Sequence, residues 1–215
     1  MKKNEALIFD LDGTITDTLH LSAIGSLHAV KEVTGKEVSL EDIKKYFGKS
    51  EERIFKAHCG PDWQKGMDSY TRFFEEKAGP SVVYPGMREV LEHLKSAGYK
   101  TAIVTGRGPV TTEIILRKTG LGRFFEHVKT GLPEANIKTQ CMKEILNLWN
   151  QPPENTYYMG DIPRDVIDAR AAGLTPLSAA WMRGIDKEGL QKENPLKIFD
   201  AVEDFSAWIK GGKSL

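Results

Sequence analysis

Residues 6–14 carry the sequence ALIFDLDGT, and this stretch decides the fold. Its apolar run predicts a short buried strand over residues 5–10. The strand ends in Asp10 and Asp12, whose side chains start on the same side because strand residues alternate between the two faces. Two buried carboxylates this close repel each other, which disfavours their charged forms. The pair therefore indicates a metal site, or a chemical task that needs both acids.

The rest of the chain alternates between two patterns. Helical spacing dominates residues 17–84, with no convincing strand. From residue 85 onward, apolar runs that predict strands alternate with helical segments, which is typical of a parallel sheet covered on both faces. The sequence thus predicts an α/β fold, a doubly wound and mostly parallel sheet with a small all-α insert after its first strand. We expect residues 1–16 and 85–215 to form the core, and residues 17–84 to form the insert.

Composition narrows the kind of partner. The 215 residues contain 30 basic and 30 acidic side chains, and neither sign forms a block. This balance argues against nucleic acid and against an anionic membrane surface as partners. The sequence contains no apolar segment long enough for a membrane helix. Cys59 and Cys141 stand far apart in the sequence, as expected for two free thiols in the cytoplasm. Because the charge balance disfavours nucleic acid and membranes, a small soluble molecule is the expected partner.

Functional side chains follow the ends of the predicted strands. Ligands of open α/β sheets bind beyond the carboxyl ends of the strands, so these side chains are expected to meet at one edge. They comprise four acids, a hydroxyl, a glycine and a lysine: Asp10, Asp12, Thr105, Gly106, Lys138, Asp161 and Asp165.

This set suits phosphoryl transfer. Carboxylate oxygens are ligands that Mg²⁺ prefers. A carboxylate can also attack phosphorus to give an aspartyl-phosphate, while a second acid protonates the leaving alcohol. A lysine and backbone amides can neutralise charge on the transferring group. We therefore expect Mg²⁺ as the cofactor and a small phosphorylated metabolite as the substrate.

Four segments of the chain resemble a known family. They are residues 10–18 (DLDGTITDT), 84–86 (YPG), 104–107 (VTGR) and 160–173 (GDIPRDVIDARAAG). With them the chain resembles a haloacid dehalogenase-superfamily phosphatase with a small helical cap, of the phosphoglycolate phosphatase and β-phosphoglucomutase-like branch. The resemblance spans nearly the whole chain and implies that the helical insert is a mobile cap over the site.

The resemblance also implies a role for each acid. Asp10 would be the nucleophile and a metal ligand. Asp12 would bind the metal through its backbone carbonyl and act as general acid and then base. Asp161 would complete the metal site, and Asp165 would support it, by direct contact with the ion or through another group.

The remaining implied roles concern the phosphoryl group. Thr105 and Gly106 would bind it, and Lys138 would pair with it and with Asp10. The family usually has Pro after this lysine, whereas this chain has Thr139, so Lys143 and Lys129 stay open as alternatives.

The sequence leaves several alternative functions open. Sugar-phosphate mutases of the family place a phosphate-binding Arg where this chain has Glu51, so a phosphatase is favoured over a mutase. A phosphonate or pyrophosphate hydrolase of the same family is a further alternative. A protein that only senses a phosphorylated metabolite is the alternative without catalysis. The protein is expected to be a monomer or a homodimer.

Overall fold

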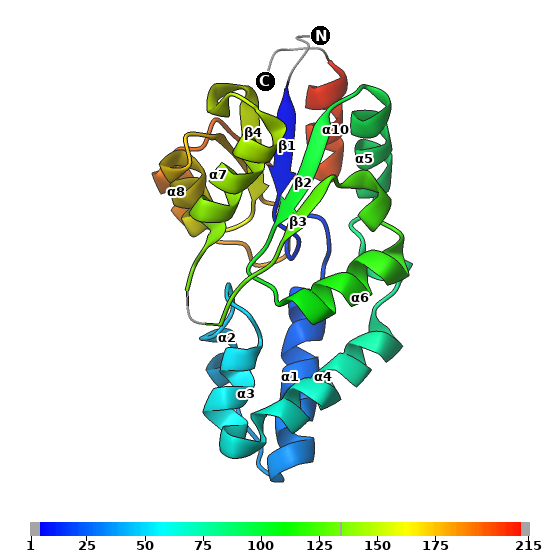
Figure 1. Ribbon diagram of the computed structural model, residues 1–215, viewed down its shortest axis with the longest axis vertical. Coiled ribbons are helices and arrows are strands. Elements are labelled where there is room, and N and C mark those ends of the chain that lie inside the picture. The colour runs from blue at the N-terminus through cyan, green and yellow to red at the C-terminus, as the bar shows by residue number, and fades with distance from the viewer. Residues whose placement is uncertain (1–4, 134, 212–215) are drawn as a thin grey trace.

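The fold is built on a fully parallel sheet (Figure 1). The computed structural model describes residues 5–133 and 135–211, so the first four and last four residues of the predicted core lie outside it. Within the described residues the sheet has six strands in the order β3-β2-β1-β4-β5-β6. These are β1 (Ala6–Phe9), β2 (Lys100–Val104), β3 (His127–Lys129), β4 (Thr156–Gly160), β5 (Thr175–Ala179) and β6 (Lys197–Phe199).

Helices cover both faces of the sheet and fill the space beyond one end of it (Figure 1). In the described part of the chain the α-helices are α1 (Leu19–Thr34), α2 (Leu40–Lys44), α3 (Glu52–Cys59), α4 (Trp63–Lys77), α5 (Met87–Ser96), α6 (Pro109–Thr119), α7 (Lys138–Trp149), α8 (Pro163–Ala171), α9 (Lys187–Glu193) and α10 (Val202–Lys210). None of the helices in residues 5–133 and 135–211 has the length and apolarity that a membrane span requires.

The central strand β1 explains why both faces are covered. All four of its residues are buried. Leu7 and Phe9 belong to the apolar cluster under α5 and α10, whereas Ala6 and Ile8 belong to the cluster under α7 and α8. An uninterrupted apolar run is what a strand buried on both sides requires, because alternate residues face opposite layers. The predicted doubly wound α/β class is confirmed.

The helical cap consists of α1, α2, α3 and α4 and lies beyond the carboxyl ends of the strands (Figure 1). Its core forms where α1 crosses α4. Gly25 of α1 lets the two helices approach closely, because a side chain there would collide with Phe73 and Tyr70 of α4. Ser39 caps the start of α2, since its Oγ accepts a hydrogen bond from Asp42 N at 3.1 Å.

The C-terminal part of the fold departs from the sequence prediction. The sequence patterns identify the first five strands, but they miss β6, α9 and α10. β6 is an edge strand of three residues, of which only Phe199 is fully buried. Such a short segment is below the length at which alternation of apolar and polar residues can be recognised, and the equally short β3 gave only a weak strand signal.

Candidate active site

Three adjacent strands bring the candidate residues together. Asp10 follows β1, Thr105 follows β2 and Asp161 follows β4, and β1 lies between the other two. The backbone continues the sheet pairing beyond the strand ends, since Asp10 N donates to Met159 O at 2.8 Å and Thr105 N donates to Lys129 O at 3.0 Å. The side chains that follow are thereby held at one edge.

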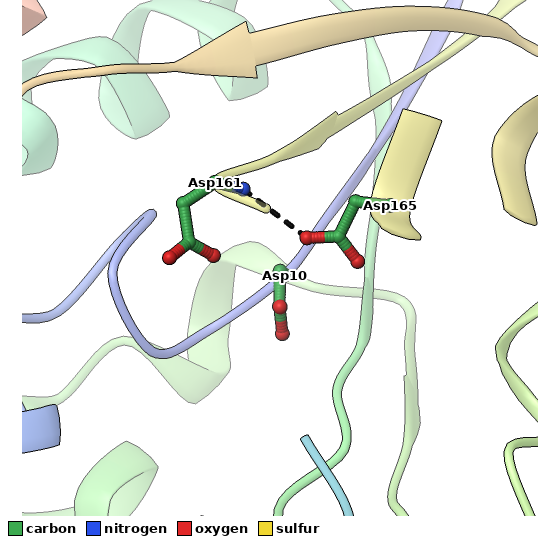
Figure 2. Close-up of side chains that lie close together, drawn as sticks. All are labelled: Asp10, Asp161 and Asp165. Carbon is green, nitrogen blue, oxygen red and sulfur yellow. Dashed lines mark hydrogen bonds between the residues drawn. The ribbon is translucent and has the colours of Figure 1, made fainter. Parts of the chain in front are cut away.

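Three carboxylates form a compact cluster at this edge (Figure 2). Asp10, Asp161 and Asp165 each offer an oxygen, and these oxygens lie within 4.8 Å of one another. All three side chains are buried. Asp165 turns back from the first turn of α8, where its Oδ2 accepts a hydrogen bond from Asp161 N at 3.2 Å (Figure 2). The structure therefore joins the acids of the first and fourth strand ends.

Lys138 lies beside two of these acids. Its Nζ is 2.6 Å from Asp10 Oδ2 and 2.6 Å from Asp165 Oδ1. Burial opposes the charge of this lysine, but the two carboxylates raise its pKa well above the ordinary value. Of the alternatives, Lys129 pairs with Glu144 at 2.7 Å and Lys143 is exposed. Only Lys138, of these three lysines, reaches the acidic cluster.

Removal of this lysine tests its contribution. If the site carries the phosphoryl transfer expected from the sequence, turnover of a phosphomonoester should fall by roughly 10²–10³-fold in Lys138→Met, because the positive charge expected beside the transferring group is lost. Initial rates of phosphate release measure the effect. Lys143→Met, at an exposed position of the same helix, is the matched control and should stay near the wild-type rate. An equal loss in both variants would contradict the assignment.

The charge balance of the cluster favours a bound cation. Burial is the largest cause that raises the pKa of Asp10 to about 6, and Lys138 only partly offsets it. Burial and the neighbouring acids also raise the pKa of Asp161 well above its ordinary value. Asp161 Oδ2 is buried and has no hydrogen-bond partner among residues 5–133 and 135–211. One lysine among three carboxylates leaves negative charge uncompensated, and hard oxygen donors suit Mg²⁺.

Two glycines make room for the cluster. Gly13 has φ +76°, and a side chain there would collide with the Asp161 carboxylate. Gly160 ends β4, and a side chain there would collide with Asp165. The Gly of the Asp-Leu-Asp-Gly stretch is thus needed both for its backbone conformation and for the close approach of Asp161.

Asp12 takes part in a different network. Its carboxylate accepts hydrogen bonds from Arg107 Nε at 3.0 Å and from Arg107 Nη2 at 2.8 Å, and another from Thr18 Oγ1. Arg107 also binds Glu51 of the cap, through Nη1 at 3.1 Å. Arg107 belongs to the Val-Thr-Gly-Arg segment, but no role was predicted for it. Its position two residues after the strand-end Thr105 was the available signal.

A cavity of about 340 Å³ lies between the core and the cap. Asp10, Asp12, Thr105, Gly106, Lys138 and Asp161 line it on the core side. The cap reaches the core directly at Gly106, where a side chain would collide with the backbone of Gly48. Apart from Asp165, every predicted site residue faces this one cavity.

Comparisons with known proteins agree with this architecture. The family described as Haloacid dehalogenase-like hydrolase matches residues 7–179. A putative pyrophosphatase PpaX from Caldanaerobacter subterraneus is 28% identical over 214 residues, which is 97% of this chain and 96% of that protein. A phosphoglycolate phosphatase from Pseudomonas syringae pv. tomato is 27% identical over 93% of this chain and 77% of its own. The crystal structure of a predicted phosphoglycolate phosphatase from Haemophilus somnus superimposes with a TM-score of 0.80 at 21% identity, covering 99% of this chain and 100% of that one.

Proposed function

We propose a function from the premise that the chain belongs to the haloacid dehalogenase-like hydrolase family. The protein is a Mg²⁺-dependent phosphatase that hydrolyses a small phosphomonoester through an aspartyl-phosphate intermediate. The observation that carries the proposal is the buried group of Asp10, Asp161 and Asp165 around Lys138, open to a cavity of small-molecule size. The names of the relatives, phosphatases and pyrophosphatases, support the same reaction class.

The proposed reaction has two halves. An Asp10 carboxylate oxygen attacks phosphorus, and the bond between phosphorus and the leaving oxygen breaks. Asp12 turns from Arg107 in its protonated form and gives its proton to that oxygen; the resulting carboxylate then takes a proton from the water that attacks the phosphorus of the aspartyl-phosphate, which releases Asp10. The alcohol and inorganic phosphate are the products.

The other residues stabilise the transferring group. Lys138 and the backbone amide of Gly106 offset negative charge on its oxygens, and the Thr105 hydroxyl donates a hydrogen bond to it. Asp10, Asp161 and the backbone carbonyl of Asp12 would hold Mg²⁺, which would supply further charge neutralisation. Asp165 holds Asp161 and Lys138 in place. The closed cap excludes bulk water from this edge.

Hydrolysis is favoured over mutase chemistry by the cap. A mutase must bind a second phosphate, but Glu51 presents a carboxylate where the family's mutases place an Arg. Pyrophosphate or phosphonate hydrolysis stays as the alternative within the family. We further propose that the protein acts in the cytoplasm, since Cys59 and Cys141 are both free thiols. As expected from the sequence, we propose that it is a monomer or homodimer.

Phosphate release from an aryl phosphate tests the proposal. We expect release with added Mg²⁺, and a drop of roughly 10²-fold after chelation that Mg²⁺ reverses, because the ion offsets charge that Lys138 alone cannot. A colorimetric phosphate assay measures the rate. Binding of phosphorylated metabolites with no release under any divalent ion would instead indicate a sensing protein.

A further inference from the structure

Arg107 is a core side chain with no donor left for a ligand. A guanidinium has five N–H groups. Nε and one hydrogen of Nη2 bind Asp12, and the other hydrogen of Nη2 binds Ser22 Oγ. Nη1 binds Glu51 Oε1 at 3.1 Å and Thr111 Oγ1 at 3.2 Å. Arg107 is also 3% exposed in its side chain, so no substrate anion can bind it in this state.

Glu51 is held as firmly as the arginine it binds. Its Oε1 accepts hydrogen bonds from Arg107 and Thr111, and its Oε2 accepts one from Gly108 N at 2.7 Å. The side chain is 8% exposed and comes from the cap, while its three partners belong to the core. The chain thus supplies its own carboxylate at the position where a second anion of a substrate could otherwise bind Arg107.

The rest of the cap-side wall offers little to an anion. Its remaining residues are largely apolar, namely Leu19, Tyr46, Phe47 and Ile54. Lys49 is half-buried, and it is the one lysine or arginine in the wall whose side chain makes no ion pair among the described residues. Glu51 would repel a second anion in the same wall.

From these contacts we propose that the substrate is a phosphomonoester with an uncharged, partly apolar leaving alcohol. Glu51 is the residue that excludes phosphomonoesters with a second anionic group. This inference rests on the proposed phosphatase function and narrows its substrate class. It sets the chain apart from the activities named for its relatives, since glycolate and phosphate are both anionic leaving groups.

Two matched substrates test the inference. 2-Hydroxyethyl phosphate and 2-phosphoglycolate differ only in that a neutral CH₂OH replaces a carboxylate. We expect the wild type to favour 2-hydroxyethyl phosphate in kcat/KM by roughly 10-fold or more, because like charges side by side are strongly unfavourable. For a substrate turned over too slowly, its inhibition constant against phenyl phosphate gives the same comparison.

Glu51→Gln should shrink this preference by roughly 10-fold, because the variant keeps the shape of the side chain and removes its charge. The ratio of kcat/KM for the two substrates does not depend on the fraction of folded enzyme, because that fraction affects both values equally. Glu52→Gln is the matched control: Glu52 is the next residue, pairs with Lys56 at 3.2 Å within the cap, and should leave the ratio unchanged.

The outcomes separate the two levels of the proposal. A wild-type preference for 2-phosphoglycolate would indicate that Lys49 binds the carboxylate of this substrate, and it would overturn the inference. An unchanged ratio in Glu51→Gln would overturn it as well. If the wild type released no phosphate from phenyl phosphate with Mg²⁺, the proposed function itself would fail, and the inference with it.

Discussion

Replacing Asp10 with asparagine is expected to abolish phosphate release, with a loss of roughly 10⁴-fold or more, as for removal of other enzyme nucleophiles. Asp10 Oδ2 contacts Lys138 at 2.6 Å, and Asp10 Oδ1 accepts a hydrogen bond from Leu11 N at 2.7 Å. The carboxylate is therefore fixed at the bottom of the cavity. An amide of the same shape fills the same space but cannot attack phosphorus at a useful rate. Single-turnover and steady-state phosphate assays measure the loss.

The control for this variant separates chemistry from folding. Asp68→Asn removes an exposed carboxylate from α4 and should keep full activity. Asp10→Asn should unfold at a temperature no lower than the wild type, because it removes one charge from a cluster in which burial and Asp165 already disfavour the ionised form of Asp10. Full activity in a folded Asp10→Asn protein would end the nucleophile assignment.

The elements of the fold that could be predicted are those with a clear local signal in the sequence. β1 is recognisable because a short apolar run without alternation, ended by Asp10, is typical of a strand covered on both faces. α6 is recognisable because Pro109 starts it and Gly120, at φ +68°, ends it. β6 and α10 lack such signals: the strand is three residues long, and the helix begins at Val202 without a side-chain cap. Packing holds them in the fold: the rings of Phe199 and Phe205 meet edge to face, with 5.2 Å between their centroids.

The sequence could predict only those contacts of the site that join residues at the ends of neighbouring strands. Asp10 and Asp161 were expected to meet because both follow buried strands of one parallel sheet, and the structure places them together. The pairing of Arg107 with Asp12 and Glu51 was not expected. These partners lie 95 and 56 residues from Arg107. Asp12 and Arg107 follow the adjacent strands β1 and β2, whereas Glu51 reaches Arg107 only because the cap folds back onto the core. No periodicity or motif spacing encodes the contact with Glu51.

The second large effect is expected for Asp12→Asn, and it should depend on the leaving group. With an alkyl phosphate the loss should be roughly 10²–10⁴-fold, because the departing alkoxide is a strong base that needs a proton. With an aryl phosphate the loss should be much smaller, because a phenolate leaves without help. The ratio of kcat/KM for the two substrates, compared between wild type and variant, measures the contribution of proton transfer.

The contacts of Asp12 make this test specific. Asparagine can still accept hydrogen bonds from Arg107 and Thr18, so the network between core and cap loses charge but keeps its shape. A purely structural role would lower the rates of both substrates by the same factor. Such an equal loss would contradict the acid and base role and leave Asp12 as a link between Arg107 and the core. A loss confined to the alkyl phosphate would identify the Asp12 carboxyl as the proton donor. The other acids in the cavity wall are Asp10 and Asp161, which belong to the acidic cluster, and Glu51, which is paired with Arg107.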